Sequence, residues 1–256
     1  MDFLLLAESG LKGDRILEAL NQPGKPYYWP IYAQPNDLAV FSTQPPRAIV
    51  EFEIPKLDST DRIRKTSSHA LYFRIKEPAN LFNLVLVHLR SQLRGKPIDW
   101  MEGIRDVNAR IQLFEGKSGD SRTIVVGDLN INPFDEELVA ASGFHAMMTR
   151  RLATGQGRFV GGRSRPFFYN PMWSRFGCEE ATGRPPGSYY YDKAEHLRHY
   201  WNIIDQVLVR PCLLEHFKDQ DLELVDQVGG TPLRKNGIPD ATNFSDHLPI
   251  LFKLGF

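Results

Sequence analysis

At 256 residues and 42% hydrophobic content, the chain is long enough to bury a large core. Lys and Arg number 31, and Asp and Glu also number 31. The composition therefore lacks the strong basic excess that is typical of a dedicated nucleic-acid-binding protein. No stretch reaches the length of a transmembrane helix, and no linker interrupts the chain, so we expect a single domain over residues 1–256 without a membrane span.

The two cysteines, Cys178 and Cys212, favour a reducing compartment and two buried thiols over a disulfide framework. The first residues, "MDFLLLAESG", contain an acidic second position and no basic region, unlike a signal peptide. We therefore expect a cytoplasmic protein. Its oligomeric state is not predicted by any pattern in the sequence.

Short apolar runs that are rich in β-formers, and bounded by Pro, Gly, Asn or Asp, dominate the chain. They predict strands at residues 2–7, 37–43, 47–54, 69–75, 81–89, 122–128, 203–209 and 248–254. Helical spacing or helix-start residues predict helices at 13–22, 97–116 and 133–141. Several strands follow one another without a helix, which favours two stacked mixed β-sheets flanked by helices over an all-parallel sheet.

The segment from Thr149 to Tyr191 differs from the rest of the chain. It is rich in Gly, Arg, Pro and aromatic residues and shows no sustained period. Irregular segments of this length are uncommon unless they are functional or disordered. The aromatic content argues against disorder, so a functional loop is expected.

Polar residues occur at the ends of several predicted strands, where an apolar core would not select them. They are Glu8, His88, Asp128, Asn130, Asp205, Asp246 and His247. Each residue alone is better explained as a cap, a turn residue or a surface residue. Together they supply oxygen ligands for Mg²⁺, a base for water and donors for a phosphate, which metal-assisted phosphoester hydrolysis requires.

The ordered series of Glu8, "VHL", "GDLNINP", "DQV" and "SDHLPI" resembles the endonuclease/exonuclease/phosphatase superfamily over nearly the whole chain. The resemblance implies an α/β fold: a DNase I-like four-layer α/β/β/α sandwich with the site at its strand ends. It also implies Mg²⁺ as the cofactor, with Mn²⁺ as a substitute. Glu8 would be the principal metal ligand, and Asp246 would lie beside the metal.

The same resemblance implies the catalytic roles. His247, oriented by Asp205, would act on the attacking water or on the scissile phosphate. Asp128 would position or activate the nucleophile, Asn130 would hydrogen-bond a phosphate oxygen, and His88 would donate to the phosphate.

Two departures from the superfamily pattern bear on the interpretation. AP endonucleases carry a Thr-Lys pair after the early Glu and lack the His-Leu motif, whereas this chain has "ESGLK" and His88, which disfavours abasic-site repair. Members usually begin with a Trp-Asn strand, but here Met1 directly precedes the strand of Glu8. We therefore expect a shortened or mis-assigned start.

Substrate-binding residues are expected in the segment 149–191. Six arginines lie between residues 150 and 175 without an acidic residue, interleaved with five aromatic rings. Arginines and rings together suit a polyanion with stackable bases, and Arg163, Arg165, Asn170 and Trp173 are the predicted contacts. The alternative is a loop anchored by its rings with solvated arginines. Arg62, Arg64 and Lys65 form a second, smaller basic cluster.

The sequence thus favours a Mg²⁺-dependent phosphodiesterase, and among these a nuclease with nucleic acid as its substrate. A phosphomonoesterase or phospholipase-type hydrolase of a small molecule is the first alternative. A catalytically inactive nucleic-acid-binding member is the second, because the Trp-Asn strand is absent. His196 and His199, three residues apart, give only a weak indication of a zinc site.

Overall fold

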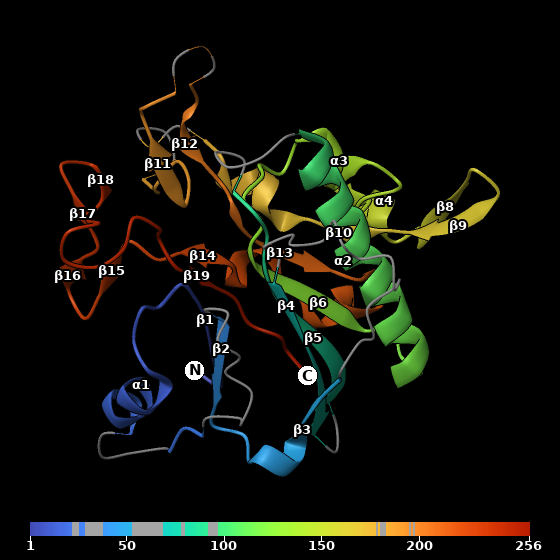
Figure 1. Cartoon of the computed structure of the whole chain (residues 1–256), viewed down its shortest axis with the longest axis horizontal. Coiled ribbons are helices and arrows are strands. Elements are labelled where there is room, and N and C mark those ends of the chain that lie inside the picture. Colours follow the sequence, from blue (N-terminus) through green and yellow to red (C-terminus); the bar gives the residue numbers. More distant parts are fainter. Residues whose placement is uncertain are drawn as a thin grey trace. The chain divides into compact units, whose positions relative to one another are not determined.

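The computed structural model describes residues 1–21, 26–28, 38–52, 69–77, 80–91, 97–177, 179, 183–194, 196 and 198–256. The chain forms two compact units, Met1–Asp128 and Leu129–Phe256. Figure 1 labels the elements of both units. That the whole chain is one domain stays a prediction.

In its described residues, the first unit contains two helices, a 3₁₀ turn and six strands. In chain order these are β1 (Phe3–Ala7), α1 (Gly13–Leu20), β2 (Leu38–Ser42), η1 (Pro46–Ala48), β3 (Ile49–Glu51), β4 (His69–Glu77), β5 (Asn80–His88), α2 (Pro97–Ser118) and β6 (Thr123–Asp128). The larger sheet of this unit has the order β3-β4-β5-β6, with antiparallel β3–β4 and β4–β5 pairs and a parallel β5–β6 pair. The predicted strands and helices of this half are confirmed within a few residues.

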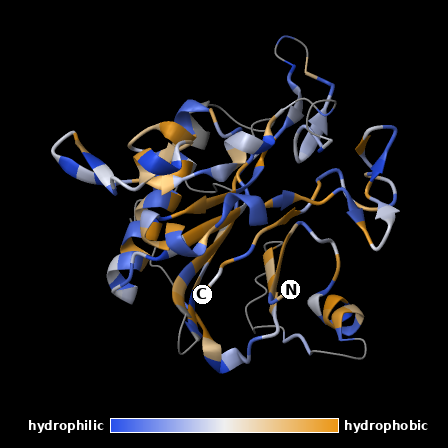
Figure 2. Ribbon diagram, turned by 180° about the vertical axis from the view of Figure 1, so that it is seen from behind, coloured by the Kyte–Doolittle hydropathy of each residue, from blue (hydrophilic) through white to orange (hydrophobic). Residues whose placement is uncertain are grey.

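Helix α2 covers the sheet because its apolar residues recur at helical spacing. Ile104, Val107, Ile111 and Phe114 are all buried. The Phe114 ring lies 5.6 Å from the Tyr72 ring of β4 and 5.0 Å from that of Phe52. Since β5 runs through α2 into β6, the helix is the crossover that a parallel strand pair needs. Figure 2 shows these strands as mostly hydrophobic ribbon.

Strands β1 and β2 form an antiparallel two-stranded ladder, with Phe3 opposite Ser42 and Ala7 opposite Leu38. Ile16 of α1 is buried against Ala39 and Phe41, and the partly buried Leu4 and Leu6 pack on the same cluster. Strand β1 also contacts β6. This packing fixes the direction of β1, which ends directly before Glu8.

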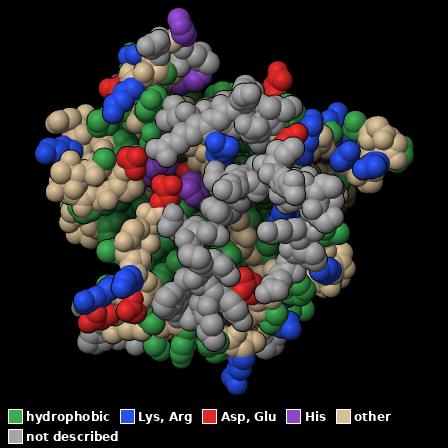
Figure 3. All heavy atoms as spheres, in the orientation of Figure 1, with side chains coloured by type: hydrophobic (Ala, Val, Ile, Leu, Met, Phe, Trp, Pro, Cys, Tyr) green, Lys and Arg blue, Asp and Glu red, His purple; other side chains and the backbone are tan. Residues whose placement is uncertain are grey.

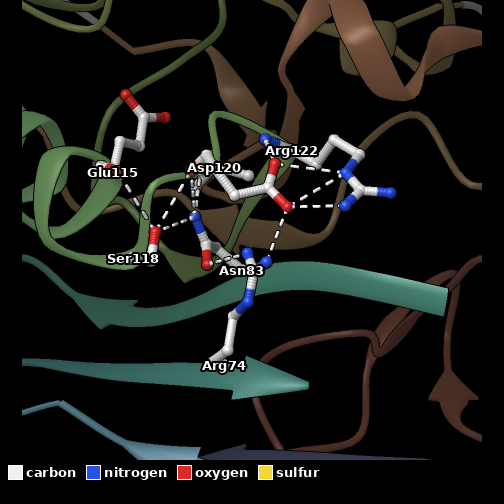
Figure 4. Close-up of polar contacts among 7 residues, drawn as sticks. Arg74, Asn83, Glu115, Ser118, Asp120 and Arg122 are labelled. Atoms are coloured by element: carbon white, nitrogen blue, oxygen red, sulfur yellow. Dashed lines mark hydrogen bonds and ion pairs between the residues drawn. The ribbon is translucent and has the colours of Figure 1, made fainter. Parts of the chain in front are cut away.

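A buried polar network fixes the amino-terminal side of β6 (Figure 4). Arg74 donates to the side chains of Asn83 and Asp120, at 2.9 and 2.7 Å. Arg122 donates to the same Asp120 carboxylate, and Asn83 donates to the Asp120 carbonyl. The network therefore ties β4 and β5 to the turn between α2 and β6.

The pKa of Asp120 makes this network sensitive to acid. Burial opposes the charge, but hydrogen bonds from Arg122 and Arg74 outweigh it and lower the pKa to about 2 from 3.8. Because the folded pKa is the lower one, the stabilisation is complete above about pH 4 and is lost as the pH falls towards 2. We expect Asp120→Asn to lower the free energy of unfolding at pH 7 by about 2 kcal/mol. Urea titrations of wild type and variant at pH 7, 4 and 2.5 would measure the difference in their free energies of unfolding. A difference that did not shrink on acidification would contradict the prediction.

The second unit consists of shorter elements. Its helices and 3₁₀ turns are α3 (Glu136–Val139), α4 (Arg150–Ala153), η2 (Pro171–Arg175), η3 (Pro211–His216) and η4 (Asp219–Asp221). Its strands are β7 (Ala146–Met147), β8 (Gly157–Val160), β9 (Arg163–Pro166), β10 (Phe168–Tyr169), β11 (Tyr189–Tyr191), β12 (Tyr200–Asn202), β13 (Asp205–Val209), β14 (Glu223–Leu224), β15 (Gln227–Val228), β16 (Thr231–Pro232), β17 (Arg234–Lys235), β18 (Ile238–Pro239) and β19 (Ile250–Leu251).

In this unit the larger sheet has the order β13-β10-β7, where β10 is antiparallel to β13 and parallel to β7. Phe144, Phe168, Leu208 and Phe217 are fully buried and form part of its core. The predicted last strand at 248–254 is shorter than expected, because only Ile250–Leu251 pair with β14, and Leu254 makes an isolated bridge to Phe217. Apart from the strand orders β3-β4-β5-β6 and β13-β10-β7, the sheets among the described residues are two-stranded, and the two stacked large sheets of the expected sandwich are not found there.

Three further expectations concern a membrane span, the two cysteines and the second basic cluster. No helix in the described part of the chain is long and apolar enough to cross a membrane. Cys212 is half-buried rather than buried. Cys178 and the basic cluster of Arg62, Arg64 and Lys65 lie outside the described residues.

Candidate active site

The first unit brings Glu8, His88 and Asp128 together. Strands β5 and β6 are parallel neighbours, and their register places His88 beside Asp128 at the carboxyl ends of both strands. His88 Nε2 lies 3.8 Å from Asp128 Oδ2 and 3.5 Å from Glu8 Oε1. The two carboxylates differ in environment, because the Asp128 side chain is 12% exposed and the Glu8 side chain 70%. Both groups would form ion pairs with a protonated His88.

Glu8 stands in an unusual backbone conformation. Its φ is 52°, in the left-handed region that residues other than Gly, Asn and Asp seldom adopt. Such a conformation costs about 1 kcal/mol or more and is characteristic of functional sites. The turn ends β1 and leaves the carboxylate exposed to solvent.

Gly127 allows Asp128 to reach its place at the end of β6. Its φ is 140°, and a Cβ at this position would lie 2.0 Å from the carbonyl oxygen of Val87 in β5. No side chain fits at that distance, so the Gly-Asp sequence is required for β5 and β6 to stay paired up to His88 and Asp128. The close approach of Val87 thus explains why a glycine precedes Asp128 at the end of β6.

We expect Gly127→Ala to lower the free energy of unfolding by about 3 kcal/mol or to prevent folding, because both the φ angle and the contact are forbidden. Gly116→Ala is the matched control, since Gly116 lies within α2 with nothing within 4 Å of its added Cβ. There the change should stabilise the protein by about 0.5–1 kcal/mol. Thermal and urea unfolding of both variants would test this prediction. Equal changes in stability for Gly127→Ala and Gly116→Ala would contradict the role of Gly127.

The second unit holds a histidine–aspartate pair. His247 Nδ1 lies 2.9 Å from Asp205 Oδ2, and both side chains are mostly buried. Since an ionised carboxylate only accepts hydrogen bonds, Nδ1 carries the proton in this contact. A neutral His247 therefore has an unprotonated Nε2 that can accept a proton.

Ser188 and Tyr189 hold both members of this pair, a role that the sequence analysis missed. The buried Ser188 Oγ accepts from the backbone N–H of Ile204 and of Asp205, at 3.3 and 3.2 Å. The Tyr189 ring lies 4.7 Å from the imidazole of His247, and the two residues form an antiparallel bridge. A serine directly before a run of aromatic residues is the sequence signal for this arrangement.

Asn132 fixes the loop after β6. Its side chain accepts from Ile203 N at 2.9 Å and donates to Asn202 Oδ1 at 3.0 Å. Gln206 adds a hydrogen bond to the Ile131 carbonyl. Asn130 has φ 52° and is only half-buried, which leaves its amide in reach of solvent. The loop is therefore anchored through Ile131 and Asn132 to residues 202–206, at the start of β13.

The remaining predicted residues are distributed through the second unit. Asp246 is exposed in the turn before His247. Arg163 and Arg165 lie on β9. Trp173 lies in η2, 6.1 Å from the Phe134 ring. Their roles stay predictions.

Asn170 is fully buried and caps η2. Its side chain accepts from Met172 N at 2.9 Å and donates to Gln206 Oε1 at 2.8 Å. A substrate could reach this amide only after these hydrogen bonds had broken. The structure therefore assigns Asn170 a structural role, and its predicted substrate contact remains untested.

The described residues contain no group of three or more His, Cys, Asp or Glu side chains that could hold a metal ion. His196 and His199 are exposed and not helical, so the weak indication of a zinc site gains no support. Mg²⁺, however, is commonly held by one or two carboxylates together with waters and substrate phosphate. The exposed carboxylate of Glu8 fits that kind of site, although it does not by itself define one.

Solved structures match this chain over 97–100% of its length. They include a variant of the 3′ phosphatase NExo from Neisseria bound to product DNA hairpin (16% identity, 100% of this chain and 89% of that chain, TM-score 0.52). Zebrafish (D. rerio) TDP2 in complex with single-strand DNA product matches at 13% identity, covering 97% of this chain and 84% of that chain, TM-score 0.53. ANGEL2, a 2′,3′-cyclic phosphatase, matches at 14% identity, covering 98% and 80%, TM-score 0.56.

These matches show that the chain shares the fold of the endonuclease/exonuclease/phosphatase superfamily, which its motifs resemble. No family model and no curated protein matches it in sequence. The expected resemblance is thereby confirmed in fold. At 13–16% identity the matches do not identify the reaction.

Proposed function

We propose that this chain is a Mg²⁺-dependent phosphodiesterase, and specifically a nuclease that hydrolyses nucleic-acid phosphodiester bonds by attack of water. The observation that carries the proposal is the His247–Asp205 pair at 2.9 Å. A histidine whose Nδ1–H is held by a half-buried carboxylate has a fixed ring and a fixed tautomer, as general acid–base chemistry requires. The shared fold with phosphoesterases supports the same class of reaction.

In this proposal each group has one task. His247 Nε2 exchanges a proton with the attacking water or the phosphate, and Asp205 stabilises the imidazolium that forms. Asp128 orients the water, while the Asn130 amide and a protonated His88 donate to phosphate oxygens. Water attacks phosphorus in line, and the P–O bond to the leaving group breaks without a covalent enzyme intermediate.

Glu8 is the residue that we assign to Mg²⁺, and Asp246 stays a predicted neighbour of the ion. A bound Mg²⁺ would neutralise charge that develops on the phosphate oxygens. The strained backbone of Glu8 and the exposure of its carboxylate support the assignment.

A phosphomonoesterase is the second candidate. Two of the matched proteins are phosphatases: NExo is a 3′ phosphatase, and ANGEL2 is a 2′,3′-cyclic phosphatase. Removal of a terminal phosphate uses the same attack of water on phosphorus, so the same residues would serve. The two candidates differ in the leaving group and therefore in the product.

Cleavage of supercoiled plasmid, single-stranded DNA and a 3′-phosphorylated oligonucleotide by the purified chain tests the proposal. Reactions with Mg²⁺, with Mn²⁺ and with EDTA, beside an Asp128→Ala variant, separate hydrolysis by this protein from contamination. Metal-dependent cutting that is lost in the variant would support a nuclease, whereas release of phosphate without strand cutting would support the second candidate. A folded protein that hydrolyses none of the three would overturn both.

A further inference from the structure

Strands β8 and β9 form an exposed hairpin that no predicted catalytic role explains. Their register pairs Gly157 with Pro166 and Val160 with Arg163, so the connection is the two residues Gly161 and Gly162. Both have positive φ, 59° and 74°, as the tightest hairpin turn requires. The hairpin projects on the side of the second unit opposite to β11 and β12, the strands next to His247 (Figure 1).

His145 holds the base of this hairpin. Its Nδ1 lies 3.0 Å from the Arg165 carbonyl oxygen, and its Nε2 accepts from Arg158 Nε at 3.0 Å. The two contacts together require the neutral ring with the proton on Nδ1. Burial, moreover, lowers the pKa of His145, which favours the same neutral form. The His145 ring also packs on Phe167, 4.4 Å between centroids, so the hairpin is fixed to the core of its unit.

One face of the hairpin is strongly basic. Residues directly opposite in an antiparallel pair share a face, so Arg158 and Arg165 lie on one face together with Val160 and Arg163. Among the described residues, none of the three arginines forms an ion pair with a carboxylate. Like charges directly opposite each other destabilise a hairpin, so the arrangement is unfavourable in the absence of an anion. Figure 3 shows basic side chains gathered on this hairpin.

The other face carries Phe159, whose side chain is 77% exposed. A phenylalanine this exposed gains nothing from folding, but its ring can stack on an unpaired base. Val160 lies on the opposite, basic face, so Phe159 is a single apolar ring on a hairpin that carries three arginines. One isolated ring together with arginines suits a nucleic-acid strand better than the interior of a bilayer.

We infer that the β8–β9 hairpin is an exosite for single-stranded nucleic acid, where Arg163 and Arg165 contact phosphates and Phe159 stacks on a base. This inference deepens the proposed function and rests on it, because that proposal makes nucleic acid the bound polymer. Because the hairpin projects away from β11 and β12, it would hold a polynucleotide at a distance from the phosphodiester that is cut. It should therefore matter for long substrates and not for small ones.

Binding is measured without turnover, by fluorescence anisotropy of a labelled single strand of about 20 nucleotides in EDTA. We expect Arg163→Gln/Arg165→Gln to weaken binding roughly 20-fold at ~0.1 M salt and to reduce the slope of log K against log salt by about 1.4. Phe159→Leu should weaken it about tenfold, and Phe159→Trp should restore it. Lys235→Gln/Lys253→Gln, which removes two exposed charges elsewhere in this unit, is the matched control and should change little.

Hydrolysis of bis(p-nitrophenyl) phosphate separates this inference from the proposed function. Phe159→Leu should retain it at the wild-type rate while it loses affinity for the strand. Loss of strand binding in the hairpin variants would support the exosite even if no substrate were hydrolysed. Equal strand affinity in wild type and variants would overturn it, as would hairpin-dependent binding to phosphatidylserine vesicles in place of the oligonucleotide.

Discussion

Asp205→Asn is expected to lower the rate of phosphodiester hydrolysis by about 10³-fold, equivalent to about 4 kcal/mol of transition-state stabilisation, while the protein stays folded. Asp205 accepts the Nδ1–H of His247 in the present structure. An asparagine could present its amide hydrogens to Nδ1 instead, which would move the imidazole proton to Nε2. The ring would keep its place, but its outer nitrogen could no longer accept a proton.

Single-turnover kinetics on single-stranded DNA would measure this loss, with circular dichroism to establish folding. Asp192→Asn is the matched control, because Asp192 is an exposed aspartate of the same unit with no assigned task. Since Asp205 acts through His247, the double variant Asp205→Asn/His247→Ala should be no slower than His247→Ala alone. Losses that multiplied in the double variant would show that the two side chains act independently.

The sequence predicted the first unit better than the second, for a physical reason. Strands such as β5 and β6 are continuous runs of Val, Ile and Leu, and α2 has a long helical period, so their identity is set locally. The candidate site residues at their ends, His88 and Asp128, could therefore be found from the strand boundaries. The two-residue strands of the second unit carry too few residues to show a period.

The β8–β9 hairpin shows what local patterns could not provide. Its sequence, "GRFVGGRSRP", contains the two glycines of a tight turn, but its strands do not alternate between polar and apolar residues. The hairpin is held by His145, which precedes it by more than ten residues and was not among the predicted residues. Likewise, Ser188 contacts Ile204 and Asp205 of the His247–Asp205 region across 16 or 17 residues of sequence. Long-range contacts of this kind leave no period in the sequence.

The second large effect is expected from Glu8→Gln, which should raise the Mg²⁺ concentration required for half-maximal activity by tenfold or more. A glutamine keeps the size of the side chain but loses the charge that holds a hard cation. The left-handed φ of 52° at Glu8 should persist, because both side chains meet the same backbone restriction. The loss should therefore arise from the carboxylate and not from the turn.

Titration of activity with Mg²⁺ distinguishes this role from a structural one. If Glu8 binds the ion, saturating Mg²⁺ should restore part of the rate, and the apparent metal affinity should change more than the affinity for the strand measured in EDTA. Glu18→Gln is the matched control, because its side chain is 74% exposed, close to the 70% of Glu8, and lies in the same unit on α1. An unchanged Mg²⁺ requirement in Glu8→Gln would exclude Glu8 as the principal ligand. It would leave the contact with His88 as the reason for the position of this carboxylate, and the variant would then change the pH dependence of the rate instead of its metal dependence.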